Sequence, residues 1–164
     1  MKTLLLLRHA KAQDAASGQA DLDRLLQDHG RVQAQAMGQF VRDRALNVEL
    51  VLCSQAARAR ETAELILTAA GLSPDIRYEP VIYEAGSLQL FDLILNLDSG
   101  ANSVLLVGHN PSLEDLLHLL TDRTGGMATC TLAKIEIDVD DWSDAAEVSG
   151  KLEWIVRAQD LLPG

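Results

Sequence analysis

Apolar residues gather along this chain in short runs that alternate with longer amphipathic segments. The first and fourth runs are almost wholly apolar, which is typical of central strands in a sheet that is covered on both faces. Two later segments, residues 131–139 and 151–156, are predicted as antiparallel or edge strands. The four earlier strands are predicted at residues 3–7, 50–53, 76–78 and 103–107.

Helical periodicity fills the intervals between these strands. Residues 58–70 end at Gly71, a residue type that commonly terminates helices. Residues 87–97 begin with Ser87 as a capping residue. A third helix is predicted over residues 111–120, with Pro111 as its first helical residue and Asn110 before it as the N-cap. The order of strands and helices predicts an α/β layered domain with a largely parallel sheet.

Two segments carry further expectations about packing. A helix over residues 30–45 is expected to place one apolar face against the core. The acidic segment over residues 138–150 is expected to form a solvated turn. The predicted apolar face of the first helix consists of Val32, Ala36, Met37, Phe40 and Val41.

Composition and charge narrow the class of protein. The chain has 164 residues, of which 48% are hydrophobic and 23% charged, as expected for one globular domain over residues 1–164. It contains no apolar run long enough for a membrane helix and no signal peptide. Cys53 and Cys130 lie in apolar stretches without metal-site spacing, and this usage predicts reduced thiols and a cytoplasmic protein.

The net charge of −10 argues against a general nucleic-acid binder, because phosphate contacts need clustered Lys and Arg. An acidic protein that binds an anion must therefore do so through a few concentrated cations. The four histidines lack the spacing of a metal site, so neither a metal nor another cofactor is predicted.

Three stretches place polar groups directly after an apolar strand. They contain Arg8 and His9, then Arg58, then His109. Ligands of open α/β sheets bind at the carboxyl ends of the strands, so these side chains are expected to converge. Guanidinium groups match phosphate oxygens bidentately, and a neutral histidine among them could attack phosphorus. The pattern predicts phosphoryl transfer through a covalent phosphohistidine, with the cations stabilising charge on the equatorial oxygens.

The same stretches resemble the histidine phosphatase superfamily, and within it the SixA-type phosphohistidine phosphatases. "LLLLRHAKA" resembles the RHG signature, with Ala10 in place of the usual Gly. "DLDRLLQDHGRVQAQAMG" resembles the family's Asp-x-x-Arg-x-Leu segment, and "CSQAARARETAE" resembles its second arginine motif. "VLLVGHNPSLEDLL" resembles the block that holds the second histidine, and "LEWIVRAQDLLP" resembles the closing strand. The resemblance implies a phosphoglycerate-mutase-like, three-layer α/β/α sandwich whose mostly parallel central sheet has an antiparallel edge.

The resemblance also implies roles for individual residues. His9 is the nucleophile, Arg8 and Arg58 bind the phosphoryl group, and His109 is a phosphate-binding partner beside the nucleophile. Arg60 is expected on a solvated face. Ser54 and Thr62 are expected to make local backbone hydrogen bonds at a helix start.

Two further candidates stay open between a functional and a structural interpretation. Larger relatives protonate the leaving group with an acidic residue, and Glu84 stands at a plausible equivalent; the alternative is a charged loop residue. Asp14 is a weaker candidate for the acid. Lys11 could reach the phosphoryl group or the substrate, or lie exposed in its loop.

The predicted activity is that of a cofactor-free phosphatase with an open pocket, since the chain is too short for a large lid insertion. An open pocket suits a phosphorylated protein, such as a phosphohistidine domain, with inorganic phosphate as product. One alternative is a phosphatase for small phosphomonoesters such as sugar phosphates. The other is a non-catalytic module that binds phosphate or phosphoproteins.

Overall fold

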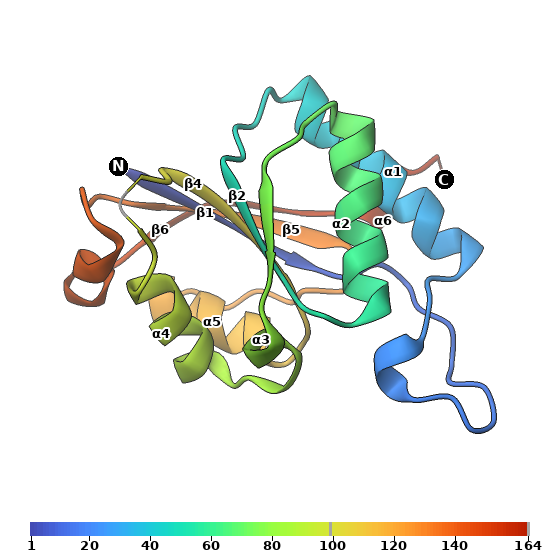
Figure 1. Cartoon of the computed structure of the whole chain (residues 1–164). Helices are drawn as coiled ribbons and strands as arrows, with labels where there is room; N and C mark the ends of the chain where they lie inside the picture. Colours follow the sequence, from blue (N-terminus) through green and yellow to red (C-terminus); the bar gives the residue numbers. More distant parts are fainter. Residues whose placement is uncertain (99, 164) are drawn as a thin grey trace.

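A six-stranded sheet runs through the middle of the computed structural model, which describes residues 1–98 and 100–163 (Figure 1). The strand order is β3-β2-β4-β1-β5-β6. β1 to β4 are mutually parallel, whereas β5 is antiparallel to both β1 and β6. The strands are β1 (Lys2–Arg8), β2 (Leu50–Cys53), β3 (Asp75–Tyr78), β4 (Ser103–Gly108), β5 (Thr131–Ile137) and β6 (Lys151–Arg157). The mostly parallel sheet with an antiparallel edge is confirmed.

Helices cover both faces of this sheet, as Figure 1 shows. One layer contains α1 (Asp28–Asp43), α2 (Ala57–Ala70) and α6 (Ala158–Leu161). The opposite layer contains α3 (Pro80–Glu84), α4 (Ser87–Leu95) and α5 (Ser112–Thr121). The three-layer α/β/α sandwich predicted from the sequence is therefore confirmed.

The leucine run of β1 contributes to both hydrophobic cores. Successive side chains of a strand point to opposite faces. Leu4 and Leu6 pack in the core beneath α4 and α5, whereas Leu5 and Leu7 pack in the core beneath α1 and α2. All four are at most 1% exposed, which explains why a central strand needs an uninterrupted apolar run.

α1 and α2 approach each other closely at Gly38. A Cβ atom at this position would lie 2.6 Å from both the Cβ of Ala69 and the carbonyl oxygen of Ile66. α1 begins at Asp28, two residues earlier than predicted, and Val32 is 48% exposed rather than part of the apolar face. The buried face instead consists of Gly30, Gln33, Ala34, Met37, Gly38 and Val41.

Two predicted capping residues do not cap their helices, although α4 does begin at Ser87 as predicted. α5 begins at Ser112, and the side-chain amide of Asn110 donates to Met127 and Glu114 instead of capping the helix. α4 is preceded by Gly86, whose N–H donates to the Gln89 side chain, so Ser87 is not its cap.

The acidic segment before β6 is more ordered than a solvated turn. It contains the 3-10 helix η2 (Trp142–Glu147), and Trp142 is fully buried. A second 3-10 helix, η1 (Asp21–Asp23), lies in the loop after β1. Within the described part of the chain, no helix has the length and apolar character needed to cross a membrane.

Candidate active site

His9 lies directly after β1, at the carboxyl edge of the parallel strands, and is 8% exposed. Its Nδ1 lies 2.8 Å from the carbonyl oxygen of Ala10. A carbonyl only accepts hydrogen bonds, so Nδ1 must carry the proton and Nε2 the lone pair of the neutral ring. The backbone therefore selects the tautomer in which Nε2 can act as a nucleophile.

His109 lies beside His9 because their strands are parallel neighbours that end in register, with Arg8 opposite Gly108. The two imidazole centroids are 5.2 Å apart. The Nε2 atom of His109 is 2.8 Å from the Ser54 hydroxyl, and the Tyr83 ring packs edge-on at 5.7 Å. The expected convergence of the two histidines is thus found in the structure.

Both histidines are held in the neutral form. Burial lowers the pKa of His9 to about 3 despite the hydrogen bond to Ala10, which acts in the opposite direction, and the positive charges of Arg58 and Arg8 add to the effect of burial. Burial and the charge of Arg58 lower the pKa of His109 to about 4. At neutral pH the imidazole of His9 is therefore unprotonated on Nε2 and available to attack an electrophile.

Arg8 reaches the same pocket from the last residue of β1. Its Nη1 atom donates to the carbonyl oxygen of Met127 over 3.2 Å. That carbonyl also accepts from the Asn110 amide, and the Met127 N–H donates to the Glu114 carboxylate over 2.7 Å. The Nε atom of Arg8 is buried and has no hydrogen-bond partner among the described residues.

Arg58 approaches from the first turn of α2 and is only 6% exposed. Its Nη1 and Nη2 atoms donate to the backbone oxygen and Oδ2 of Asp21, over 2.9 Å and 3.1 Å. The Tyr83 hydroxyl donates to the same Oδ2 atom. Like that of Arg8, the buried Nε atom of Arg58 lacks a partner within the described ranges. Arg60 is exposed, as predicted, and its guanidinium lies over the Tyr78 ring.

Two hydroxyls brace the backbone around these groups. Thr62 accepts the N–H of Ala10 and donates to the carbonyl oxygen of Arg58. Ser54 accepts the N–H of Ala56 at the start of α2, besides its contact with His109. The predicted local hydrogen bonds are confirmed, and both hydroxyls in addition link separate parts of the pocket.

Three of the predicted candidates lie outside this network. Glu84 is exposed at the end of α3, and its side chain forms no hydrogen bond or ion pair with any other described residue. Lys11 and Asp14 are also exposed. The side chain of Lys11 takes no part in the hydrogen bonds and ion pairs of the described residues, although its backbone N–H donates to Gln33.

Sequence reasoning missed three contributors to the pocket, namely Asp21, Tyr83 and Glu114. Asp21 opens the Asp-x-x-Arg-x-Leu segment and Glu114 lies in the block that holds the second histidine, so these two stand within recognised motifs, whereas Tyr83 does not. Asp21 and Tyr83 meet through a side-chain hydrogen bond between residues 62 positions apart, which no local pattern reveals.

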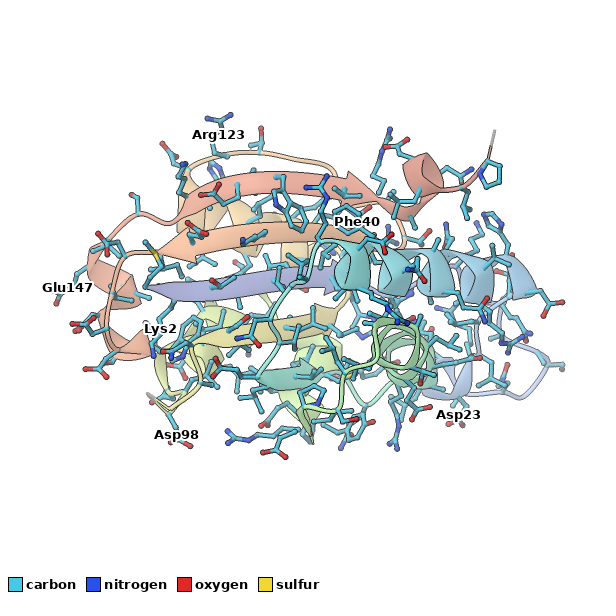
Figure 2. The ribbon with its side chains drawn as sticks, turned by 90° about the horizontal axis from the view of Figure 1, so that it is seen from above. Lys2, Asp23, Phe40, Asp98, Arg123 and Glu147 are labelled. Atoms are coloured by element: carbon cyan, nitrogen blue, oxygen red, sulfur yellow. The ribbon has the colours of Figure 1, made fainter. Side chains whose placement is uncertain are left out.

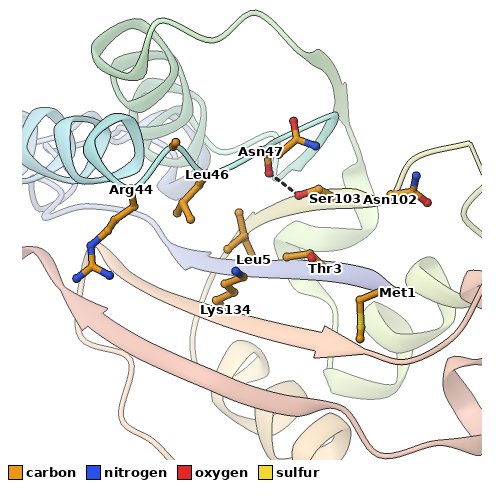
Figure 3. A pocket seen from close by; sticks show the side chains of 10 residues that line it. Met1, Thr3, Leu5, Arg44, Leu46, Asn47, Asn102, Ser103 and Lys134 are labelled. Carbon is orange, nitrogen blue, oxygen red and sulfur yellow. Dashed lines mark hydrogen bonds between the residues drawn. The ribbon is translucent and has the colours of Figure 1, made fainter.

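The rest of the described chain contains no competing reactive cluster. It holds no group of three or more His, Cys, Asp or Glu side chains placed to bind a metal. A separate hollow of about 260 Å³ lies at the opposite end of β1 (Figure 3). Its lining includes Met1, Thr3, Arg44 and Lys134 and holds no histidine or cysteine.

The sequence profile described as the histidine phosphatase superfamily (branch 1) matches residues 4–88. An uncharacterised protein of Mycobacterium tuberculosis is 33% identical over 119 residues, which cover 73% of this chain and 72% of the relative. The chain therefore belongs to the histidine phosphatase superfamily.

Among solved structures, those of SixA-type proteins of that superfamily are similar to this chain. The protein assigned as phosphohistidine phosphatase SixA from Nakamurella multipartita is 29% identical, with a TM-score of 0.82 over 95% of both chains. Its counterpart from Agrobacterium tumefaciens is 31% identical, with a TM-score of 0.82 over 94% of this chain and 97% of that one. A SixA structure complexed with tungstate, at 22% identity and a TM-score of 0.81, shares the fold over 98% of this chain and 99% of its own. The chain is a histidine phosphatase with a SixA-like, phosphoglycerate-mutase-like fold.

Proposed function

We propose that this protein removes phosphoryl groups through a covalent phosphohistidine on His9, and that its substrate is phosphohistidine in a protein. The observation that carries the mechanism is the arrangement of donors around His9. Its neutral ring lies beside His109, while Arg8 and Arg58 each have a buried Nε–H without a partner. Buried donors normally find an acceptor, so two such groups in one pocket support the binding of an anion here.

In the proposed reaction the Nε2 lone pair of His9 forms a bond to phosphorus as the bond to the leaving group breaks. Arg8, Arg58 and His109 hold the phosphoryl oxygens and stabilise their charge in the transition state. Water then attacks the phosphohistidine, and inorganic phosphate leaves as His9 regains its lone pair. Burial keeps His9 neutral for this first step, because it lowers the pKa of the ring to about 3.

The substrate proposal draws on the relatives and on the nature of the leaving group. The SixA-type proteins of similar structure are named for phosphohistidine. An imidazole leaving group needs little help from an acid, whereas an alkoxide requires a proton. This difference is consistent with the exposed, unpaired position of Glu84, which remains the candidate acid for ester substrates. We further propose that Lys11, which is exposed in the loop after β1, contacts the substrate protein. We also propose that residues 1–164 form a single domain without a large lid insertion, which leaves the pocket open to a phosphorylated protein.

The proposal is tested by trapping the intermediate. Wild type, His9→Ala and His118→Ala are mixed separately with a phosphohistidine protein and with p-nitrophenyl phosphate. We expect phosphate release and an acid-labile, base-stable phosphoryl adduct in wild type and His118→Ala, and neither in His9→Ala. His118 is the matched control, because it is an exposed histidine on α5.

Three results would overturn all or part of the proposal. Turnover that survives in His9→Ala would exclude His9 as the nucleophile. A higher kcat/KM for p-nitrophenyl phosphate than for the phosphohistidine protein would exclude the substrate class while leaving the covalent mechanism in place. Tight binding of the phosphoprotein without any turnover would identify a binding module instead.

A further inference from the structure

We propose that Asp21 determines substrate specificity: its carboxylate covers the outer edge of Arg58 and disfavours substrates with a second anionic group beside the phosphoryl group. This inference rests on the proposed function, because it takes Arg58 as a ligand of the phosphoryl group. It concerns a residue outside the set of four that the sequence motifs single out.

The first evidence is the way in which Asp21 divides the Arg58 guanidinium. The two terminal nitrogens donate to Asp21, one to its backbone oxygen and one to Oδ2. The Nε–H is buried and unpartnered. Asp21 thus occupies the outer edge of the group, and the Nε edge is left for one phosphoryl group.

The second evidence is that the Asp21 carboxylate is fixed in place and charged. Tyr83 donates its hydroxyl to Oδ2, and Arg24 donates from Nε to Oδ1 over 2.9 Å. These hydrogen bonds and the charge of Arg58 lower the pKa of Asp21 to about 2. The Tyr83 ring in turn packs on His109, so the carboxylate is tied to both sides of the pocket.

The third evidence is position. The Asp21 side chain is 52% exposed although it contacts a buried arginine, so its carboxylate lies between the pocket and solvent. A leaving group that carries a carboxylate or second phosphate would either lie against this negative charge or displace it from Arg58. A neutral or cationic leaving group, such as imidazole, meets neither obstacle. The structure therefore favours phosphorylated side chains without a neighbouring anion over small phosphorylated acids.

The test compares two substrates that differ by one negative charge, phenyl phosphate and 3-carboxyphenyl phosphate, whose leaving groups are of similar basicity. For wild type we expect the larger kcat/KM with phenyl phosphate. Asp21→Asn keeps an oxygen for Arg58 and Tyr83 but removes the charge. We expect it to raise the ratio of kcat/KM for the carboxylated substrate to that for phenyl phosphate by roughly five- to tenfold, less at high salt.

Two further variants keep the test decisive. Asp23→Asn removes the same charge from the same 3-10 helix, where the exposed Asp23 side chain forms no hydrogen bond or ion pair with Arg58 or Tyr83, and we expect less than about a twofold change in the ratio. Tyr83→Phe frees the carboxylate but keeps the ring, and we expect a smaller rise than in Asp21→Asn. All three are compared at equal folded fraction, from thermal unfolding.

An unchanged ratio in Asp21→Asn, with both substrates slowed equally, would reduce Asp21 to a brace for Arg58 and overturn the inference. An equal change in Asp23→Asn would assign the effect to net charge and would overturn it as well. Neither result touches the covalent mechanism, which is tested separately by the adduct on His9 and by the loss of turnover in His9→Ala.

Discussion

Packing two imidazoles together beside two arginines lowers the free energy of unfolding under acidic conditions. Each is removed from water and surrounded by positive charge, so protonation is disfavoured in the folded protein, with a pKa of about 3 for His9 and about 4 for His109. In the unfolded chain a histidine takes up its proton near its ordinary pKa of about 6.5. The pocket that keeps the nucleophile neutral must therefore weaken the fold in acid.

The sign of this effect follows from proton linkage. Between a pH of about 6.5 and the lowered pKa values, the unfolded state binds more protons, so the free energy of unfolding falls as pH falls. We expect wild type to lose stability between pH 7 and pH 5 in denaturant titrations. A His9→Asn/His109→Asn double variant should show a flatter dependence over the same window. Parallel curves for the two proteins would contradict the burial of neutral imidazoles.

At this scale the sequence predicted the residues that belong to contiguous motifs. Arg8, His9, Arg58 and His109 were all placed in one pocket by the rule that parallel strands end at the same edge. Asp21 could not be placed there, because its partners lie 37 residues away, in Arg58, and 62 residues away, in Tyr83. Pairings of that range depend on how η1 and α3 fold over the sheet.

The packing of α1 on α2 controls where Arg58 stands, since α2 carries it in its first turn. Gly38 permits this packing, because its missing side chain leaves room for Ala69 and the backbone of Ile66. Apolar periodicity could not reveal it, since Gly30, Gln33 and Gly38 contribute no hydrophobic signal to the buried face. A pattern that counts only apolar residues also assigned Val32 wrongly to that face, because Val32 is apolar although it is exposed.

Gly38→Ala is expected to destabilise the protein although alanine favours helices. The added Cβ would lie 2.6 Å from two atoms of α2, and overpacking of this kind costs about 1–3 kcal/mol. Denaturant unfolding should show the loss, and Gln35→Ala, at an exposed position of the same helix, should change stability by no more than about 0.5 kcal/mol. Increased stability in Gly38→Ala would mean that α1 and α2 are more loosely packed than described.

Across the whole molecule, the two ends of the sheet have different tasks. The carboxyl ends of β1, β2 and β4 carry the candidate catalytic groups, together with the loop that contains η1. The opposite end is closed by η2 and by the buried Lys2, whose ammonium group donates to Asn102. Figure 2 shows Asp23 at one end of the molecule and Lys2 and Glu147 at the other. The α/β order of elements predicted this polarity, but the acidic composition of residues 138–150 concealed the buried Trp142.

If the two ends of the sheet have these separate roles, removing a large buried side chain at the η2 end should reduce stability without altering the reaction. Trp142 is fully buried, donates its indole N–H to the carbonyl oxygen of Ala101 over 2.7 Å, and lies near the Lys2 ammonium group. Trp142→Ala should lower the free energy of unfolding by about 3–5 kcal/mol. Below the unfolding transition, kcat/KM for p-nitrophenyl phosphate should stay within about twofold of wild type.

The matched control for this variant is Glu147→Ala, an exposed position of the same 3-10 helix, which should change stability by no more than about 0.5 kcal/mol. Thermal unfolding and steady-state kinetics on the three proteins separate the two quantities. A fall in kcat/KM for folded Trp142→Ala would show that the two ends of the sheet are coupled. Unchanged kinetics would show that the contacts that hold His9 beside His109 do not depend on the packing of Trp142.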